Sequence, residues 1–353
     1  MQNQDLYGGT IEFRQATYDD LDNIMNFIKR FWSSNHIFAT DKEFLTYEHG
    51  NSDWSLNFII GFDVKTEEIR SIQGFIPYSD NIQKLHVCGV FSKVHPQNNI
   101  PLLGVETMKK MLEITNPVTY CGIGTNPKTM LPIVKKFFKR HTGIMSHFYM
   151  LNKKIKDYRI AIPSCLETEK FKRLRYDTKN QLLYREVYTF GDLEKQFDSL
   201  KISRKLPFKN LYYIKKRYFE NPIYKYRNFK ILDQMHHMVG FLVTREVKVN
   251  KSACLHIVDY IGEISFLGNI GNILETLLNE HNYEYIDCLC TGLEDSLLEK
   301  SGFRKKALVG EVVIPSHFEP FIQKNIEIHF EKSEPDLVLF KGDSDADRPS
   351  FQK

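Results

Sequence analysis

One arrangement of strands and helices occurs twice along the 353 residues, and this repeat limits the possible folds more than any other feature. In the first half, apolar strand patterns surround predicted helices at residues 101–114 and 130–139. The second half repeats that order, with predicted helices at 273–280 and at 295–301, the latter ended by Gly302. The predicted strands cover residues 11–15, 57–62, 69–78, 85–94, 119–125 and 145–152, then 230–232, 238–247, 253–260, 285–289, 312–315 and 337–341. We therefore expect an α+β fold of two similar halves, each a mixed, mostly antiparallel sheet flanked by helices.

The length of the chain suits two domains of ordinary size. Residues 153–209 have the weakest periodicity and carry two basic clusters, which we interpret as solvated surface. We predict an N-terminal catalytic domain at 1–155, a connection at 156–200 that opens the second domain, and a structural or acceptor-shaping domain at 201–353.

Composition excludes several classes of protein. The net charge is +4, from 48 basic and 44 acidic residues along the whole chain, which is too weak and diffuse for a nucleic-acid surface. No signal peptide opens the sequence and no apolar run of about 18 residues occurs, so we expect a cytoplasmic protein without a membrane span. The six cysteines have no framework spacing, and we expect reduced thiols and no metal.

A strand, a polar loop and a helix follow one another at residues 94–104, with the sequence Val-His-Pro-Gln-Asn-Asn-Ile-Pro-Leu-Leu-Gly. This stretch resembles the P-x-x-[RQ]-x-x-G-x-G loop of the GNAT acyltransferases, with Asn99 at the Arg or Gln position, Leu102 at the first glycine and Gly104 at the second. The strand end at 122–126 and the Leu-Glu-Lys-Ser-Gly-Phe run at 298–303 resemble further parts of the same family.

The tandem arrangement is similar to the CoA-dependent N-acyltransferases of nucleotide-linked amino sugars, of the anthrose-biosynthesis type. The resemblance implies two GNAT-like halves, acetyl-CoA or another acyl-CoA as co-substrate, and a nucleotide-linked amino sugar as acceptor in surface polysaccharide biosynthesis. The resemblance is also compatible with a homo-oligomer. Two alternatives stay open: a FemX-like aminoacyl transferase, and a non-catalytic GNAT-like binding protein.

The expected CoA site uses a helix N-terminus, because its free N–H groups and positive dipole end attract the pyrophosphate. The cofactor-binding residues predicted on this basis are Val90, Phe91, Asn98, Asn99, Leu102, Leu103, Gly104 and Asn126. The polar and aromatic residues around the first helices predict His36 and Glu48 as acceptor contacts.

The predicted chemistry is direct attack of an amine on the thioester. Simple alternation along the strand at 85–94 places His86, Cys88, Val90 and Ser92 on one face, so His86 is the candidate base and Ser92 a second catalytic candidate. The apolar surroundings of Cys88 speak against a reactive thiolate and an acyl-enzyme.

The second half lacks an equivalent phosphate loop, since Gly268 and Gly271 have neither the usual spacing nor a basic neighbour. Near the C-terminus, Asp343, Asp345, Asp347 and Arg348 match a calcium loop poorly. We expect a polar segment whose charges pair with one another.

Overall fold

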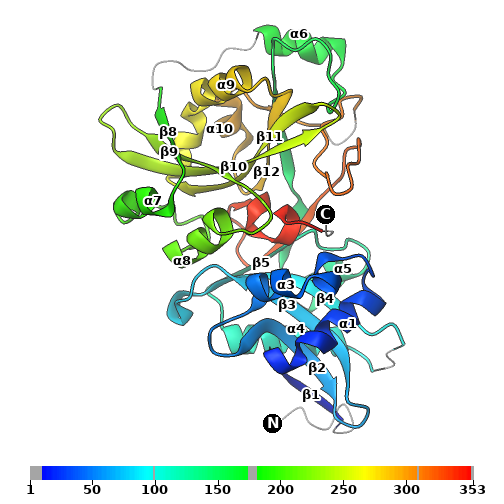
Figure 1. Ribbon diagram of the computed structural model, residues 1–353. Coiled ribbons are helices and arrows are strands. Elements are labelled where there is room, and N and C mark those ends of the chain that lie inside the picture. Colours follow the sequence, from blue (N-terminus) through cyan, green and yellow to red (C-terminus); the bar gives the residue numbers. More distant parts are fainter. Residues whose placement is uncertain (1–9, 98–99, 174–180, 308–309, 351–353) are drawn as a thin grey trace.

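The computed structural model describes residues 10–97, 100–173, 181–307 and 310–350. Figure 1 shows two bodies joined end to end, with the N-terminal half in one, most of the second half in the other, and the C-terminal segment between them. In the described residues, no helix is long and apolar enough to cross a membrane.

The first sheet has seven strands in the order β1-β2-β3-β4-β5-β14-β6. Only β4 and β5 run parallel, and all other neighbours are antiparallel. The strands are β1 (Ile11–Thr17), β2 (Ser55–Asp63), β3 (Glu68–Pro77), β4 (His86–Val94), β5 (Thr119–Ile123), β6 (His141–Ile144) and β14 (His329–Lys332).

The second sheet repeats this plan with eight strands, in the order β13-β7-β12-β11-β10-β9-β8, and β15 pairs with β12. Its parallel pair is β11 with β12. The strands are β7 (Ser146–Leu151), β8 (Leu183–Val187), β9 (Arg227–Leu232), β10 (Met238–Val249), β11 (Ser252–Gly262), β12 (Tyr285–Thr291), β13 (Arg304–Lys305) and β15 (Leu339–Phe340).

The two sheets exchange one strand each, so they do not coincide with the predicted segments 1–155 and 201–353. β7 leaves the N-terminal half to pair with β12, and β14 returns from the C-terminal half to pair with β5 and β6. The sequence analysis did not predict β14, and the strand expected at 312–315 is wrong, because only Val313 forms an isolated bridge there, with Ile162.

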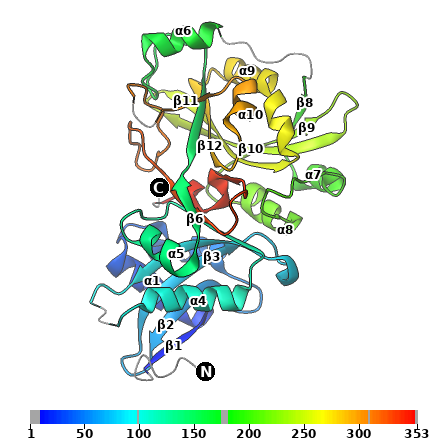
Figure 2. The same cartoon turned by 180° about the vertical axis from the view of Figure 1, so that it is seen from behind.

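Helices cover both faces of the first sheet. The spacing of Leu21, Ile24, Phe27 and Ile28 puts one apolar stripe of α1 into the core. α1 to α3 lie on one face, and Figure 2 shows α4 and α5 on the other. Their bounds are α1 (Leu21–Phe31), α2 (Ile37–Thr40), α3 (Lys42–His49), α4 (Leu103–Thr115) and α5 (Met130–Phe138).

The second sheet packs α9 against one face through Ile273, Leu274 and Leu277. A π-helix, η4, continues from α8 toward the first half. The remaining elements are α6 (Cys165–Arg173), α7 (Phe190–Phe197), α8 (Leu211–Ile214), η4 (Lys215–Phe219), α9 (Gly271–Glu280), α10 (Asp295–Lys300) and two short 3-10 turns near the C-terminus, η6 (Lys341–Asp343) and η7 (Asp345–Asp347).

Candidate functional site

The ladder between β4 and β5 ends early. Their parallel pairing covers His86 with Thr119, Val87 with Tyr120 and Cys88 with Cys121, and then stops. β4 continues to Val94 along β3, whereas β5 continues along β14. Beyond Cys88 the two central strands diverge, so the edge of β4 on that side has no ladder partner among the described residues.

A β-bulge lies just inside this opening. Gln73 pairs with Ser92 and Gly74 with Val90, which leaves Phe91 as an extra residue with φ of 50°. A left-handed conformation is costly for a large non-glycine residue, and such residues concentrate at functional sites. The Gln73 side chain supports the bulge by donating from Nε2 to the carbonyl oxygen of Val90 at 2.9 Å.

The bulge corrects the predicted placement of Ser92. Gln73 and Gly74 are consecutive and point to opposite faces, so their partners Ser92 and Val90 do too. The prediction that Val90 and Ser92 share a face is wrong, because the extra residue shifts the alternation.

His86 lies at the closed end of the strand pair. Its Nδ1 is 2.6 Å from the Thr119 hydroxyl, and burial lowers the pKa of its ring. Phe91 is five positions further along the chain, about 16 Å along an extended strand. The structure therefore does not bring His86 to the opening.

The predicted phosphate loop leads into α4. Leu102 adopts the left-handed conformation (φ 59°) at the N-cap, so it has the backbone shape that glycine usually supplies there. A Cβ on Gly104 would lie 3.0 Å from a methyl carbon of Val94, so the helix start packs closely on β4. Leu103 is buried beneath, and Asn98 and Asn99 lie outside the described residues.

The Asn126 side chain accepts hydrogen bonds in the turn before α5. Its Oδ1 accepts from the backbone N–H groups of Lys128 and Thr129 at 2.9 and 3.2 Å. The side chain thereby shapes the turn between β5 and α5.

On the α1 face, an aromatic cluster surrounds Phe91. The ring of His36 lies 4.9 Å from that of Phe91, and its Nδ1 accepts from the Phe38 backbone N–H at 3.1 Å. Burial, together with the charge of Arg348, lowers the pKa of His36 to about 3. The Arg348 guanidinium lies 4.3 Å from the Phe38 ring and 4.6 Å from the Phe91 ring. The predicted acceptor residue His36 and the predicted cofactor residue Phe91 are thus brought together.

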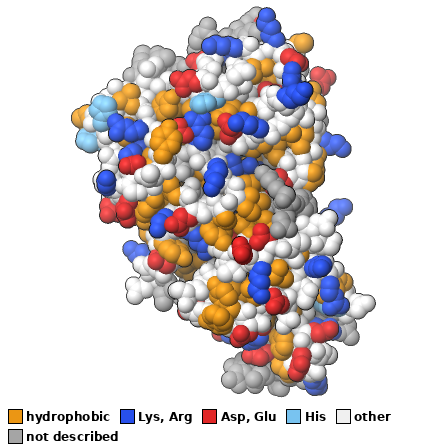
Figure 3. Space-filling view, in the orientation of Figure 1, with side chains coloured by type: hydrophobic (Ala, Val, Ile, Leu, Met, Phe, Trp, Pro, Cys, Tyr) orange, Lys and Arg blue, Asp and Glu red, His pale blue; other side chains and the backbone are white. Residues whose placement is uncertain are grey.

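Glu48 joins the two halves. Its Oε1 accepts from Arg217 Nη1 at 2.9 Å, and Arg217 Nη2 also donates to the carbonyl oxygens of Ser344 and Asp347. These contacts hold α3, η4 and the C-terminal segment together. Figure 3 shows apolar and basic side chains gathered across this middle part of the molecule.

A small pocket opens beside Glu48 and Arg217. Its wall combines tyrosine rings with amides and one ammonium group. The lining residues are Tyr47, Glu48, Asn51, Asn57, Ile76, Pro77, Tyr212, Tyr213, Lys216 and Arg217. Burial lowers the pKa of Lys216, whose ammonium faces the Tyr47 ring. Such a wall suits a polar ligand that has hydroxyl groups and a flat or ring-shaped body.

The C-terminal segment, residues 341–350, supplies residues that the sequence analysis did not assign to the site. Its charges pair mainly with the rest of the molecule, which corrects the expected self-paired segment: Asp343 contacts Lys209 at 2.5 Å, and Asp347 contacts Arg245 at 2.7 Å. Asp345 and Arg348 do pair with each other, at 2.8 Å. No group that could hold a metal ion occurs in the described part of the chain. The run of alternating aspartates was the only local signal of these roles.

On the opposite face of the opening, the Tyr120 side chain crosses β4. A Cβ on Gly89 would lie 2.0 Å from the Tyr120 hydroxyl, so only glycine fits at this position. Beside it, Glu331 of β14 leans over Gly122, and burial raises the pKa of Glu331 to about 7. The sequence pattern did not predict this carboxyl group, because β14 was not recognised.

The second sheet contains a similar opening that is filled. β11 pairs with β12 only from Leu255 to Ile257, and the register with β10 shifts around Val258. The C-terminal segment enters there: a Cβ on Gly342 would lie 2.5 Å from the carbonyl oxygen of Val258. Lys209 is buried between Asp259 and Asp343, at 2.6 and 2.5 Å.

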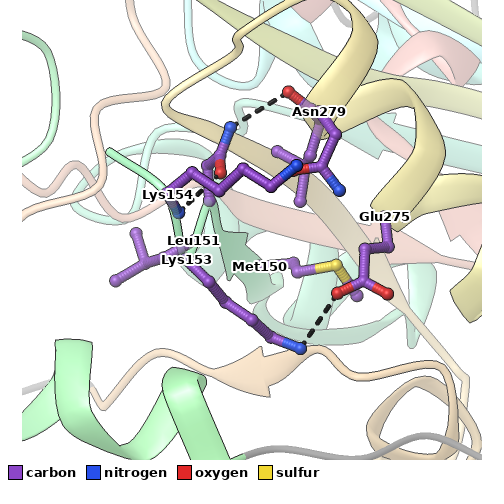
Figure 4. A pocket seen from close by; sticks show the side chains of 8 residues that line it. Met150, Leu151, Lys153, Lys154, Glu275 and Asn279 are labelled. Carbon is purple, nitrogen blue, oxygen red and sulfur yellow. Dashed lines mark hydrogen bonds and ion pairs between the residues drawn. The ribbon is translucent and has the colours of Figure 1, made fainter. Parts of the chain in front are cut away.

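Another small pocket lies at the end of β7 beside α9. Figure 4 shows that Lys153 spans its rim to Glu275, at 3.0 Å between Nζ and Oε1. Its other side chains are mostly aliphatic or amide groups, and it lies away from both openings, so we do not assign chemistry to it.

Comparison with known proteins gives similarity in structure alone. The sequence matches no family model and no curated protein. A probable N-acyltransferase from Enterococcus faecalis V583 superposes with a TM-score of 0.56 at 8% identity, over 92% of this chain and 72% of that one. A GCN5-related N-acetyltransferase from Anabaena variabilis gives 0.52 at 9% identity, over 91% and 72%. The predicted fold class, α+β with two GNAT-like halves, is confirmed.

Proposed function

We propose that this protein is an acyl-CoA-dependent N-acyltransferase whose reaction takes place in the first half. The observation that carries the proposal is the opening of the β4/β5 ladder beside the left-handed bulge at Phe91. A free strand edge accepts an extended, amide-bearing ligand as an added strand would, and pantetheine has this form. The likeness of the fold to N-acyltransferases agrees with this reading.

Acyl-CoA would lie along β4 with its pyrophosphate at the start of α4. The free N–H groups of the first helical turn and the dipole of a helix of 13 residues favour an anion there. We retain Val90, Phe91, Leu102, Leu103 and Gly104 as proposed contacts, and Asn126 as a neighbour of the opening. Acyl-CoA is a cytoplasmic metabolite, so the proposal places the enzyme in the cytoplasm.

The bulge has a chemical use in this reaction. The bulge takes Phe91 out of the regular register of the ladder, and we propose that its N–H donates to the oxygen that becomes negative in the tetrahedral intermediate. Burial raises the pKa of the Cys88 thiol, which keeps it protonated and unreactive. The protonated thiol favours direct attack of an amine over an acyl-enzyme, whereas the N–H donor would serve either route.

The acceptor would occupy the pocket beside Glu48. Tyrosine rings and two asparagine amides suit a sugar or nucleoside, and Lys216 adds a positive charge for a phosphate. We therefore propose a nucleotide-linked amino sugar of a surface-glycan pathway as acceptor. In this scheme the segment 1–155 binds acyl-CoA, 156–200 connects, and 201–353 shapes the acceptor site through Arg217 and the C-terminal segment.

Two measurements test the proposal. Calorimetry should detect binding of acetyl-CoA, and thiol release from acetyl-CoA should accelerate when nucleoside-diphosphate amino sugars such as UDP-glucosamine are added. Absence of acetyl-CoA binding would contradict the proposed site. Binding without thiol release favours the non-catalytic alternative, and a gel shift with tRNA favours the FemX-like one.

A further inference from the structure

The C-terminal segment contacts the openings of both sheets. Lys341–Asp343 fills the opening of the second sheet, and five residues later Arg348 lies over the rings of Phe38 and Phe91 at the first. Asp345 lies between these two contacts. A single stretch of backbone therefore anchors itself in the second half and presents side chains to the first.

Among the three aspartates of this segment, Asp345 alone keeps solvent access. Its side chain is 20% exposed, whereas those of Asp343 and Asp347 are 0% exposed. Lys209 holds Asp343 and Arg245 holds Asp347, so both have structural partners. In the described residues, Asp345 Oδ2 accepts a hydrogen bond from Arg348 Nη2.

The surroundings of Asp345 are polar and incompletely paired. Buried within the same group of side chains, Glu48 Oε2 and Arg348 Nη1 have no hydrogen-bond partner in the described structure, and both side chains are 6% exposed. Buried polar atoms of this kind normally have a partner, which points to a ligand or water between them. Glu48 and Arg217 also line the pocket described above, and Arg217 Nη2 donates to the carbonyl oxygen of Ser344, the residue before Asp345.

The charged groups that face Asp345 come from three elements: Arg348 of its own segment, Glu48 of α3 and Arg217 of η4. Burial raises the pKa of Asp345, with Glu48 adding to this and the two arginines opposing it. Arg348 links the Asp345 carboxylate to the opening, because it donates to Asp345 Oδ2 at 2.8 Å and its guanidinium lies 4.6 Å from the Phe91 ring.

We infer that Asp345 is the general base of the proposed reaction, delivered to the first half by the C-terminal segment. This rests on the proposed function. The acceptor nitrogen bonds to the thioester carbonyl carbon, and the nitrogen's proton passes to the Asp345 carboxylate. Collapse of the intermediate breaks the carbon–sulfur bond, CoA thiolate takes a proton from solvent, and Asp345 returns its proton to solvent.

Three other side chains near the opening or on β4 fit this role less well. His36 Nδ1 already accepts a backbone hydrogen bond. Glu48 is committed to Arg217 through Oε1, and His86 is at the far end of β4. Asp345 is the carboxylate that combines solvent access with a fixed position on Arg348, whose guanidinium itself lies over the Phe91 ring.

The test compares Asp345→Asn and Asp345→Glu with Asp336→Asn, a control in the exposed turn before β15. Each variant is assayed with acetyl-CoA and UDP-glucosamine, and also for hydrolysis of acetyl-CoA by water. We expect Asp345→Asn to lower kcat at least ~10²-fold, the usual scale for loss of a general base, while the Kd for acetyl-CoA changes less than about twofold. Asp336→Asn should match the wild type.

A pH profile separates catalysis from structure. The wild-type rate should rise with pH as Asp345 deprotonates, with a midpoint above the ordinary range for aspartate. This rise of the rate with pH should be absent in Asp345→Asn and present in Asp345→Glu. Wild-type kcat and an unchanged acidic limb in Asp345→Asn would overturn the inference while leaving the proposed function intact. A wild-type protein that binds acetyl-CoA but neither transfers nor hydrolyses the acetyl group would also overturn it, whereas failure to bind acetyl-CoA would count against the proposed function itself.

Discussion

The first and second sheets have the same central feature and use it differently. In each, one parallel pair of strands separates after three residue pairs, and a bulge interrupts one strand of that pair, β4 or β11, beyond the last pair. In the second sheet the chain closes the gap with Gly342, and a buried lysine bridges two aspartates across it. In the first sheet the bulge residue Phe91 is left-handed, and the edge of β4 stays unpaired in the described structure. A duplicated architecture can thus keep one edge open and convert the other into a structural joint.

The largest expected effect is a loss of folding stability when the Lys209 bridge at the opening of the second sheet is removed. Lys209→Met removes the ammonium from between Asp259 and Asp343 and leaves two buried carboxylates facing each other. Loss of one partner from a buried ionic group costs about 3–5 kcal/mol. Urea unfolding should show a loss of this size, and Lys205→Met, on an exposed side chain nearby, should be nearly neutral. An unchanged midpoint for Lys209→Met would mean that the second opening does not depend on this bridge.

The second prediction tests whether acetyl-CoA binding depends on the first half and not on the second. Gly104→Asp places a carboxylate at the start of α4, where two negative charges about 4 Å apart repel by ~4 kcal/mol at an effective dielectric constant of 20. We expect acetyl-CoA affinity to fall at least about tenfold, measured by calorimetry. Gly104→Ala tests the crowding against Val94 without the charge. The isosteric Asn269→Asp, at the corresponding connection of the second half, should leave the affinity unchanged; equal losses in both halves would remove the distinction between them.

A pH effect of intermediate size should come from the first opening. The folded-state pKa of His36, about 3, lies below the ordinary value of 6.5, so between these values the unfolded chain binds the additional proton. Stability contributed by neutral His36 is therefore present above pH 6.5 and is lost as pH falls. At pH 5.5 the loss is on the order of 1 kcal/mol relative to pH 7.5. Thermal melts should show a smaller difference between these pH values in His36→Asn, and an identical slope in both proteins would contradict the assignment.

The smallest effect concerns the thiol beside the opening. Cys88→Ala should retain most of the transfer activity, within about threefold, because burial keeps this thiol protonated and direct attack does not require it. Steady-state kinetics with acetyl-CoA provides the measurement. Mass-spectrometric capture of an acetyl group on Cys88 in the wild type would overturn direct attack.

Local sequence determined the identity of most elements. Apolar periodicity located the strands at β2 to β5 and the helices α4 and α5, because side chains that face a core repeat with the period of their backbone. The strand–loop–helix pattern at residues 94–104 identified the start of α4, and Leu102 kept the left-handed shape of the glycine it replaces. These features depend on neighbours in the chain, so the sequence alone reveals them.

Tertiary structure decided how the elements are combined. The exchange of β7 and β14, the face of Ser92 beyond the bulge and the place of Arg348 over the Phe91 ring all depend on contacts between residues far apart in the chain. A short strand such as β14 carries no local mark of its partner, since backbone hydrogen bonds form equally well with any edge of suitable register. For the same reason, a run of alternating aspartates could be noticed in the sequence but not assigned: only the packing of the C-terminal segment against both halves separates the buried, paired Asp343 and Asp347 from the accessible Asp345.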